Sequence, residues 1–346
     1  MTTYSVNDFS SQLFYQDNKH TQSNIVTYVI NVFIPLSNGC RNKCAYCGFR
    51  SDNPFLLLPN DVIKILRGSK RAWEALFTFG ERPEVHKSIR TKLKEIGFKN
   101  FIDYVIEMNK LAISTGLLPH TNAGVISKIE MKKLRRYNAS LGLMLEQAVE
   151  LECHRFSPGK KPEKRIKVIK NAGKLKIPFT TGILIGIGEK REDRIYSLEV
   201  ISDLHENYGH IQEVIIQNFT PKKGTPMENW PSPTVHEMLD TVKIAREILP
   251  DDVTIQIPPN LVKDVYPFIK AGARDIGGIS DYTPDYINPE HPWPSIEELK
   301  KRLGKEFVLK PRLSIYPKFV KMGWFSDEIS DLILKLADDD GFKREI

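Results

Sequence analysis

The sequence predicts an α/β fold, a closed barrel in which parallel strands alternate with helices. From Ile25 onward, short strand-like runs alternate with longer helical patterns along most of the 346 residues. Each interval between runs is long enough for a right-handed crossover between parallel strands. Eight such units make a TIM-like (β/α)8 barrel the economical solution, with a six-unit barrel as the main alternative. The expected strands are 25–36, 75–79, 117–121, 139–145, 179–185, 211–217, 253–257 and 275–279.

Helix signals between these strands support the alternation. Pro83 sits where a first helical turn would begin. Ser127 and Glu130 have the spacing of a capping box, and an apolar helical face follows them. Thr234 opens a further amphipathic stretch. We therefore expect helices to begin near these residues.

The chain is predicted to consist of a barrel with a segment at each end. Residues 1–24 are polar and irregular, and we expect them to cover one end of the fold. Residues 25–304 form the barrel itself. Residues 305–346 form a C-terminal helical extension that packs on the barrel through apolar side chains, namely Tyr316, Phe319, Trp324 and Leu332.

The formal net charge of +7 raises the question of nucleic-acid binding. The densest basic stretch, however, falls on a predicted helix with an apolar face, and no recognised nucleic-acid motif accompanies it. We therefore expect no nucleic-acid partner. The basic residues of this stretch are Lys160, Lys161, Lys164, Arg165, Lys167 and Lys170.

The sequence also argues against a membrane protein. The long apolar run 25–36 contains Thr27 and Asn31, and it is too short and too polar to cross a bilayer. The N-terminal residues lack the basic start and apolar core of an export signal. Clustered thiols without obvious disulfide partners favour a reducing compartment, and we expect the cytoplasm.

Three of the four cysteines form a compact motif directly after the first expected strand. Cys40, Cys44 and Cys47 are spaced so closely that chance placement is on the order of two in ten thousand. A closed zinc site or an ordinary ferredoxin site needs four protein ligands. Three thiolates on a four-iron cluster would leave one iron open. An open iron can bind a substrate or cosubstrate, so the motif indicates chemistry rather than a structural staple.

With aromatic Tyr46 just before its last cysteine, this loop resembles the cluster loop of the radical S-adenosylmethionine (SAM) superfamily. The resemblance implies a 4Fe-4S cluster held by the three cysteines and a (β/α)8 radical SAM barrel. It also implies that SAM chelates the fourth iron, and that one electron cleaves SAM to a 5′-deoxyadenosyl radical. The cofactors then carry the chemistry, and the protein places them and excludes water.

Further motifs match this family in part. Phe79-Gly80-Glu81 resembles the family's Gly-Gly-Glu motif, which holds the SAM amino group, although Phe79 replaces the first glycine. Gly182 and Gly186 belong to a stretch that resembles the glycine-rich motif beside the adenine. By the same resemblance, Glu146 and Arg165 would hold the SAM ribose and carboxylate. The alternatives are a surface turn for Glu81 and an ordinary helix-surface position for Arg165.

Polar residues that follow the other strands are candidates for substrate contacts, because barrel enzymes place their chemistry at the carboxyl ends of the strands. His120 is the candidate acid or base, with a structural histidine as the alternative. Asp281 is a second catalytic candidate. The remaining candidates for substrate binding are Asn122, Gln217, Asn218, Gln256 and Tyr282.

Longer blocks between Cys40 and Pro294 narrow the resemblance. Together they resemble the CofG subunit family of 7,8-didemethyl-8-hydroxy-5-deazariboflavin (FO) synthase. This resemblance implies a carbon-nitrogen lyase that converts the adduct 5-amino-5-(4-hydroxybenzyl)-6-(D-ribitylimino)-5,6-dihydrouracil to FO with ring closure and loss of ammonia. It implies an electron donor, and it leaves open whether the chain forms a complex with a partner subunit. The blocks include CRNKCAYCGFR, GLLPHTNAG, HRFSPGKKPEKR, TTGILIGIGE and DIGGISDYTPDYINPEHPWP.

Three alternatives remain open at this point. One is the partner radical SAM enzyme, which joins the hydroxybenzyl group of tyrosine to ribitylaminouracil. The second is a radical SAM enzyme related to the hydrogenase maturases. The third is a zinc-stapled binding protein, with Cys153 as the fourth ligand. Cys153 is otherwise a small buried hydrophobe, and a single leftover cysteine cannot build a second cluster.

Overall fold

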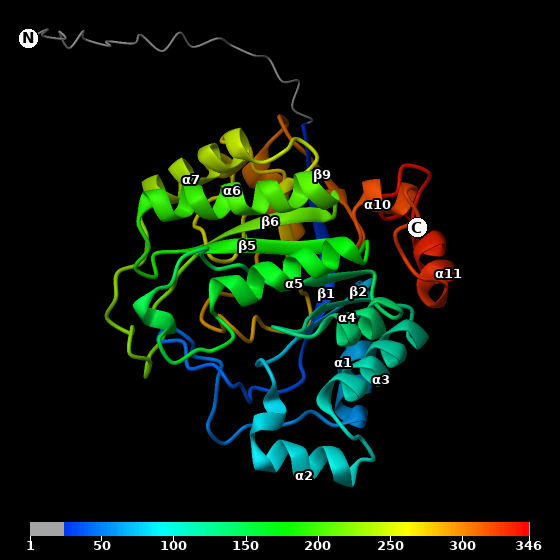
Figure 1. The fold of residues 1–346 in the computed structure, drawn as a ribbon. Helices are drawn as coiled ribbons and strands as arrows, with labels where there is room; N and C mark the ends of the chain where they lie inside the picture. The colour runs from blue at the N-terminus through cyan, green and yellow to red at the C-terminus, as the bar shows by residue number, and fades with distance from the viewer. Residues whose placement is uncertain (1–23, 346) are drawn as a thin grey trace, which may run out of the picture.

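The computed structural model describes residues 24–345, which fold into a barrel of parallel strands surrounded by helices (Figure 1). Apart from Asn24, the N-terminal segment that we expect to cover the fold lies outside the described residues. No helix in the described part of the chain combines the length and apolar character that a membrane span requires.

The strands pair in sequence order and close into a ring, because β1 pairs with β2 on one side and with β8 on the other. All of these pairs are parallel. The predicted eight-strand barrel is confirmed, and the six-unit alternative is wrong. The strands of the ring are β1 (Ile25–Pro35), β2 (Glu74–Thr78), β3 (Leu118–Asn122), β4 (Ser140–Gly142), β5 (Phe179–Ile185), β6 (Ile211–Asn218), β7 (Thr254–Gln256) and β8 (Asp275–Ile279).

The observed strands differ from the predicted ones only at their ends. The largest difference is at 139–145, of which only Ser140–Gly142 is a regular strand. Beyond Gly142 the chain still runs along β5, and the Glu146 nitrogen donates to the Gly182 carbonyl oxygen at 3.2 Å. Glu146 has a positive φ of 65°, a conformation that bulky residues rarely adopt, and it ends the extended segment there.

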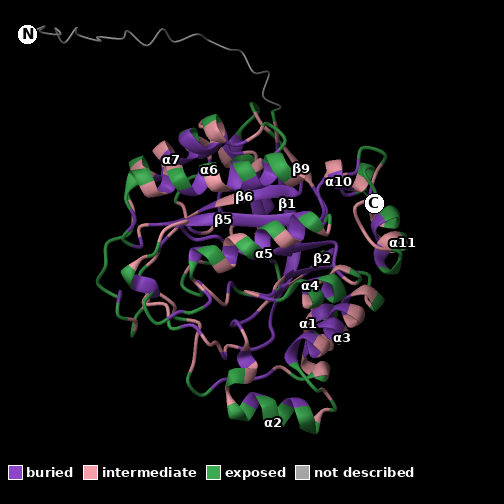
Figure 2. Cartoon of the chain, in the orientation of Figure 1, coloured by how far each residue is buried: buried purple, intermediate pink, exposed green. Residues whose placement is uncertain are grey.

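Helices cover the outside of the ring, and Figure 2 shows their outward faces exposed around the buried strands. Most follow a strand and cross back to the next one, as parallel neighbours require. They are α1 (Pro59–Gly68), α2 (Lys87–Glu95), α3 (Phe101–Ser114), α4 (Lys128–Arg135), α5 (Pro162–Lys174), α6 (Arg191–Tyr208), α7 (Val235–Ile248), α8 (Tyr266–Lys270) and α9 (Ile296–Leu303), with short 3₁₀ turns η1 (Pro83–Val85) and η2 (Glu152–His154).

The predicted helix starts are found at two of the three positions. Ser127 caps α4 through a hydrogen bond from the Glu130 nitrogen at 3.2 Å, and the Glu130 carboxylate accepts from the Ser127 nitrogen at 2.7 Å. Thr234 caps α7 in the same way. Pro83 instead begins the 3₁₀ turn η1, and the regular helix starts only at Lys87.

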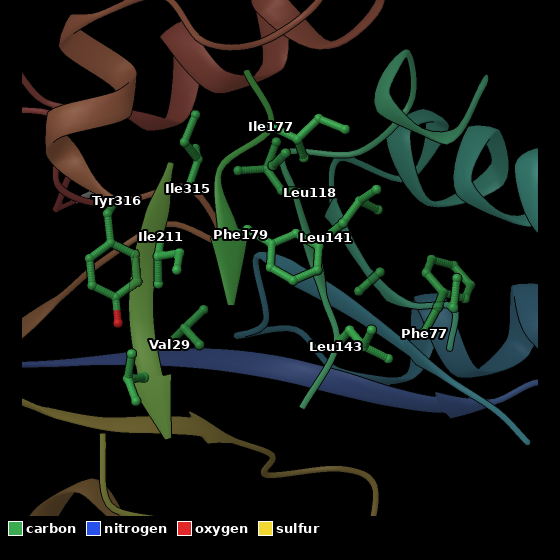
Figure 3. Packing of buried hydrophobic residues seen from close by; sticks show 14 of the residues in the cluster. Val29, Phe77, Leu118, Leu141, Leu143, Ile177, Phe179, Ile211, Ile315 and Tyr316 are labelled. Atoms are coloured by element: carbon green, nitrogen blue, oxygen red, sulfur yellow. The ribbon is translucent and has the colours of Figure 1, made fainter. Parts of the chain in front are cut away.

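The main apolar core lies between the strands and the surrounding helices. Figure 3 shows part of it, where Phe77, Leu141 and Phe179 pack together with side chains of neighbouring strands. Along β2 the side chains alternate, because successive residues of a strand face opposite sides. Phe77 is fully buried in this outer layer, whereas Leu76 and Thr78 line the interior of the barrel.

The C-terminal extension packs on the barrel and begins with a ninth strand. β9 (Val308–Pro311) runs parallel to the first residues of β1. After it come α10 (Pro317–Lys321) and α11 (Asp327–Leu336), which lie beside the barrel in Figure 1. Of the apolar residues predicted to fasten the extension, Tyr316 and Phe319 are buried.

The segment 312–316 crosses the amino ends of the strands. The Arg312 nitrogen donates to the Tyr28 carbonyl oxygen at 2.8 Å. The carbonyl oxygen of Ser314 accepts from Ser140 Oγ at 2.6 Å and from Gln212 Nε2 at 3.0 Å. Figure 3 shows the following residues, Ile315 and Tyr316, beside strand side chains of the core. The extension therefore closes the amino end of the barrel and leaves its carboxyl end for the site.

Candidate active site

A cavity of about 420 Å³ lies inside the barrel, a size typical of small-molecule sites. Its wall includes all three cysteines of the motif, Cys40, Cys44 and Cys47, near the carboxyl end of β1. It also includes residues near the amino ends of the strands, such as Glu74 and Glu213. One cavity therefore joins the cysteine loop to the closed end of the barrel.

Backbone hydrogen bonds to three other segments hold the cysteine loop. The Arg41 nitrogen donates to the Glu81 carbonyl oxygen at 2.8 Å, and the Ala45 nitrogen to the Cys153 carbonyl oxygen at 2.9 Å. The Lys43 nitrogen donates to Ser157 Oγ at 3.1 Å. The loop is thus fixed from both sides, which keeps its thiols at the edge of the cavity.

The thiols are free, and two of them accept hydrogen bonds at sulfur. Cys40 Sγ accepts from the nitrogens of Asn42 at 3.3 Å and Glu81 at 3.2 Å. Cys44 Sγ accepts from Ser157 Oγ at 3.3 Å. Burial raises the pKa of Cys40 to about 11, while both backbone donors oppose that rise. Such donors suit sulfurs that carry negative charge when they bind iron.

The three thiols suit the ligand set of an iron-sulfur cluster. Within residues 24–345, no group of three or more His, Cys, Asp or Glu side chains is arranged to hold one metal ion. An iron-sulfur cluster spreads its thiolates over separate irons. Cys40, Cys44 and Cys47, which line one cavity, are the residues that would hold such a cluster.

Gly80 and Glu81, at the carboxyl end of β2, lie directly against the cysteine loop. A Cβ at Gly80 would lie 2.1 Å from the Gly39 carbonyl oxygen, so only glycine permits this contact. The Glu81 carboxylate is buried and accepts from Arg41 Nε at 2.6 Å and from the Val125 nitrogen at 2.8 Å. The surface-turn interpretation of Glu81 is therefore wrong, and both residues line the cavity.

Arg165 and Glu146 form a charged group on the cavity wall. Arg165 is only 4% exposed, so the helix-surface alternative is wrong. Its guanidinium donates to the Met144 carbonyl oxygen at 2.6 Å and lies 3.7 Å from the Glu146 carboxylate. Burial raises the pKa of Glu146, but the charges of Lys160 and Arg165 outweigh burial and lower it overall. Glu146 is therefore an anion inside the barrel.

Gly182 and Gly186 have structural reasons to be glycine, and neither lines the cavity. A Cβ at Gly182 would lie 2.3 Å from the Ile215 carbonyl oxygen on β6. Gly186 has a φ of 92°, and its nitrogen donates to the Glu189 carboxylate at 2.9 Å. Leu184, which stands between them, does reach the cavity. The predicted adenine contact of these glycines stays a prediction.

His120 and Asn122 project from β3 into the cavity. His120 Nδ1 lies 2.7 Å from Ser140 Oγ, and its Nε2 lies 3.3 Å from the Asn122 side-chain oxygen. Burial lowers the pKa of His120 to about 4, so the imidazole is neutral at neutral pH. Gln217 and Gln256 also line the cavity.

Besides Gly182 and Gly186, three more of the predicted site residues fall outside the cavity. Asn218 Nδ2 donates to the Leu261 carbonyl oxygen at 3.1 Å, behind the wall. Asp281 accepts from Ser69 Oγ at 2.9 Å, and Tyr282 is 52% exposed. The reason is a tight turn after β8, in which Ser280 Oγ bonds to Thr283 Oγ1 at 2.8 Å and directs the two residues between them outward. Asp281 and Tyr282 are therefore not brought to the site.

Tyr46 lies on the cavity wall and pairs with a histidine behind it. Its hydroxyl lies 2.9 Å from His154 Nε2. Burial lowers the pKa of His154 to about 4, so the ring that Tyr46 contacts is neutral at neutral pH. The neighbouring Cys153 is buried in a small apolar cluster with Leu184 and Met227, as its structural interpretation predicts.

Several cavity residues were not found by sequence reasoning. Asn31, Glu74 and Glu213 lie on strands whose other residues are mainly apolar, and a charged residue near the start of such a strand is a usable signal. Arg312 follows the barrel in the C-terminal extension, and no local pattern marks it. Lys160 was interpreted as one of several surface cations, yet its side chain reaches the cavity.

Comparison with known proteins agrees with this site. Residues 34–201 match the family model described as the Radical SAM superfamily. A solved structure of HydG, a maturase of the [FeFe]-hydrogenase, superposes with a TM-score of 0.67 at 17% identity and covers 90% of this chain and 70% of HydG. At that identity the likeness concerns the fold alone. The barrel and its three-cysteine loop define a radical SAM protein, a class that implies a 4Fe-4S cluster and SAM.

Curated relatives specify the family further. The chain is 64% identical over 321 residues to the 7,8-didemethyl-8-hydroxy-5-deazariboflavin synthase of Archaeoglobus fulgidus, covering 92% of this chain and 99% of the relative. It is 52% identical over 320 residues to the synthase of that name from Methanosarcina acetivorans, covering 91% and 97%. The chain belongs to the family of the 7,8-didemethyl-8-hydroxy-5-deazariboflavin synthases.

Proposed function

We propose that this enzyme converts 5-amino-5-(4-hydroxybenzyl)-6-(D-ribitylimino)-5,6-dihydrouracil to FO, closing the central ring and releasing ammonia as a carbon-nitrogen lyase. One observation carries the proposal: three free cysteines lie on the wall of a cavity inside the barrel, in a chain 64% identical to a named FO synthase. The substrate is a small molecule, and a cavity of about 420 Å³ is of the right order for it.

Cys40, Cys44 and Cys47 would hold the cluster, with backbone and hydroxyl donors at the first two sulfurs. When bound, the cluster and SAM supply the radical chemistry that removes a hydrogen atom from the substrate. The protein brings both to one edge of a closed barrel, where walls on the other sides exclude water.

Four wall residues would position SAM. Glu146 carries a fixed negative charge, which suits the hydroxyls of a ribose, and Arg165 carries the positive charge that suits a carboxylate. Gly80 brings a backbone segment close to the cysteines, where carbonyl oxygens can accept from an ammonium. Tyr46, held by His154, gives a flat apolar surface beside the last cysteine.

His120 is a neutral imidazole on the cavity wall with a polar partner at each ring nitrogen. Its Nδ1 lies 2.7 Å from Ser140 Oγ, and its Nε2 lies 3.3 Å from the Asn122 side-chain oxygen. A neutral imidazole has one nitrogen that donates and one that accepts, so the ring can take up a proton. Ring closure with loss of ammonia requires proton transfers, and His120 is the residue we assign to one of them. Asn122, Gln217 and Gln256 would contact the uracil edge.

Turnover of the adduct by purified, anaerobically reconstituted enzyme tests this proposal. The enzyme is incubated with SAM and a reductant, and with either the adduct or free tyrosine plus ribitylaminouracil. FO formed from the adduct alone supports the proposal. Turnover that occurs only with free tyrosine overturns it and assigns the chain to the partner reaction. In the cell, the enzyme would work in the cytoplasm with an electron donor and in complex with the partner subunit.

A further inference from the structure

The amino end of the cavity has a wall of polar side chains, which we call the polar floor. In most (β/α)8 barrels, bulky branched side chains fill this space in layers. Here the residues come from the starts of β2 and β6, from β1, and from the segment that closes the barrel. The polar floor consists of Asn31, Glu74, Gln212, Glu213, Arg312 and Ser314, all of which line the cavity.

Glycines keep the interior open at the places where amide side chains point inward. A Cβ at Gly278 on β8 would lie 2.1 Å from Asn31 Nδ2. A Cβ at Gly142 on β4 would lie 2.1 Å from the Asn122 side-chain oxygen. Each glycine thus leaves the room that one amide needs. The barrel is built to hold polar groups along its axis rather than a packed apolar core.

Asn31 has an unmet hydrogen-bonding capacity in this floor. Its side chain is 1% exposed, and its Nδ2 donates to Glu74 Oε1 at 3.4 Å. Its Oδ1 is buried and accepts no hydrogen bond from any residue that the structure describes. A buried amide oxygen without a donor destabilises the fold by about 1 to 3 kcal/mol. A ligand that brings an O–H or N–H group to this point removes that cost.

The floor carries little net charge. Arg312 is held by the Asp275 carboxylate through contacts of 2.6 and 3.0 Å, and it also lies 3.2 Å from Glu213 Oε1. Burial raises the pKa of Glu213 to about 8, and it also raises the pKa of Glu74. As a neutral acid, Glu213 offers one donor and one acceptor. Such a surface suits a neutral ligand with several hydroxyls and does not suit a phosphate or a carboxylate.

We propose that the polar floor binds the ribityl chain of the substrate, with Asn31 Oδ1 accepting a hydrogen bond from one of its hydroxyls. This inference rests on the proposed function. Each ribityl hydroxyl both donates and accepts, which matches Glu74, Glu213 and Gln212. The ring system of the adduct then lies toward the cysteine end, where Phe33 and Phe49 line the cavity. The floor would thus set the depth at which the reacting atoms are held.

The experiment compares two forms of the adduct, one with the ribityl chain and one with a butyl chain that lacks hydroxyls. Both are tested for kcat/KM with the reconstituted enzyme. Binding of FO and of its N10-butyl analogue is measured separately by equilibrium dialysis. The enzyme is expected to prefer the ribityl compounds by about a hundredfold, since a polar site left unpaired rejects an apolar analogue. Loss of one hydrogen bond should reduce that preference about tenfold.

Asn31→Leu is the test variant, and Asn31→Ser is the second one if the leucine variant does not fold. The control is Gln217→Leu, which changes a polar wall residue near the carboxyl end of β6. The proposal expects a reduced ribityl preference in either Asn31 variant and an unchanged preference in the control. If the Gln217 variant loses the preference for ribityl compounds and both Asn31 variants keep it, the ribityl chain binds at the carboxyl end of the barrel. That result would overturn the proposal.

The unchanged enzyme alone can also overturn it. Equal binding of FO and the butyl analogue means that no part of the cavity recognises the hydroxyls. Failure of the proposed function has a different signature, because then the ribityl adduct yields no FO at all. In that case equilibrium dialysis with FO and its butyl analogue still measures whether the polar floor recognises the ribityl hydroxyls. Failure of the proposed function can therefore be distinguished from failure of the ribityl proposal.

Discussion

The backbone nitrogen of Glu81 donates a hydrogen bond to the sulfur of Cys40 at 3.2 Å. This contact joins the end of β2 to the cysteine loop after β1, two segments that meet because their strands are neighbours in the barrel. Cys40, the first of the three proposed cluster ligands, is thus positioned by the barrel itself and not only by its own loop. Changes in the β2 end should therefore affect the cluster without unfolding the protein.

Gly80→Ala should lower the iron content of the enzyme several-fold. The new Cβ would lie 2.1 Å from the Gly39 carbonyl oxygen and 2.7 Å from Cys40 Cβ, so the cysteine loop must move. Iron per chain after anaerobic reconstitution is the measurement, with circular dichroism to check the fold. Gly209→Asn is the control, because Gly209 ends α6 in open space and asparagine tolerates its φ of 62°. Equal iron in both variants would refute the packing argument.

Cys44→Ala should abolish the brown colour and the bound iron, whereas Cys153→Ala should keep both. Cys44 lines the cavity and accepts a hydrogen bond at sulfur, while Cys153 is buried among Leu184 and Met227. Replacing Cys153 by alanine removes one atom from that apolar cluster and should lower the stability of the fold only slightly. Visible absorption and iron analysis provide the comparison. Loss of iron from the Cys153 variant would mean that the cluster has a fourth protein ligand.

Glu146→Gln should weaken SAM binding about tenfold, because a charged hydrogen-bond acceptor is replaced by a neutral amide. The carboxylate is buried, and the charges of Lys160 and Arg165 keep it ionised. Equilibrium dialysis with SAM on the reconstituted protein measures the effect. Glu150→Gln serves as the control, because it makes the same chemical change at an exposed glutamate. The nearest cation in an ion pair with Glu150 is Lys161, at 4.0 Å on the surface. An unchanged SAM affinity in the Glu146 variant would remove this residue from the SAM site.

His210→Gln should make the protein less sensitive to acid. Burial, and secondarily the charge of His205, lower the pKa of His210 to about 3. Between pH 6.5 and 3 the unfolded chain therefore binds more protons at this residue than the folded chain, so stability falls as the pH drops. From pH 7 to pH 4.5 the histidine should cost roughly 2 kcal/mol of unfolding free energy that the variant does not lose.

Denaturant unfolding at both pH values checks this loss. A glutamine at position 210 can keep a bond like that of His210 Nε2 to the Ile169 carbonyl oxygen, which measures 2.9 Å. His236→Gln is the matched control, because His236 is exposed at the start of α7. If both variants lose stability in acid as the unchanged protein does, the buried histidine is not a source of acid sensitivity.

Local patterns in the sequence predicted the barrel and its order of strands well. Short strand-like runs, capping residues and crossover lengths correctly predicted the eight strands of the ring and the caps at Ser127 and Thr234. The end of β4 was less predictable. The chain beyond Gly142 still bonds to β5, yet Glu146 leaves the extended conformation because of its tertiary surroundings.

Site residues could be predicted only where a reactive or polar residue type stands at or near the end of a predicted strand. The cysteine spacing pointed to a cluster, and His120, Gln217 and Gln256 lie on strands whose side chains line the cavity. The direction of a side chain after a strand depends on the turn, which is why Asp281 faces away. Arg312 comes from the segment that closes the amino end of the barrel. It reaches Asp275 through a contact between distant parts of the chain, which no local pattern predicts.

Cys40, Cys44 and Cys47 are proposed to hold an iron-sulfur cluster with one iron left for SAM. Iron and sulfide analysis of the anaerobically reconstituted protein, with electron paramagnetic resonance after reduction, tests this proposal most directly. We predict about four irons per chain and a reduced-cluster spectrum that changes when SAM is added. One tightly bound zinc without iron, or a cluster spectrum that does not respond to SAM, would contradict it.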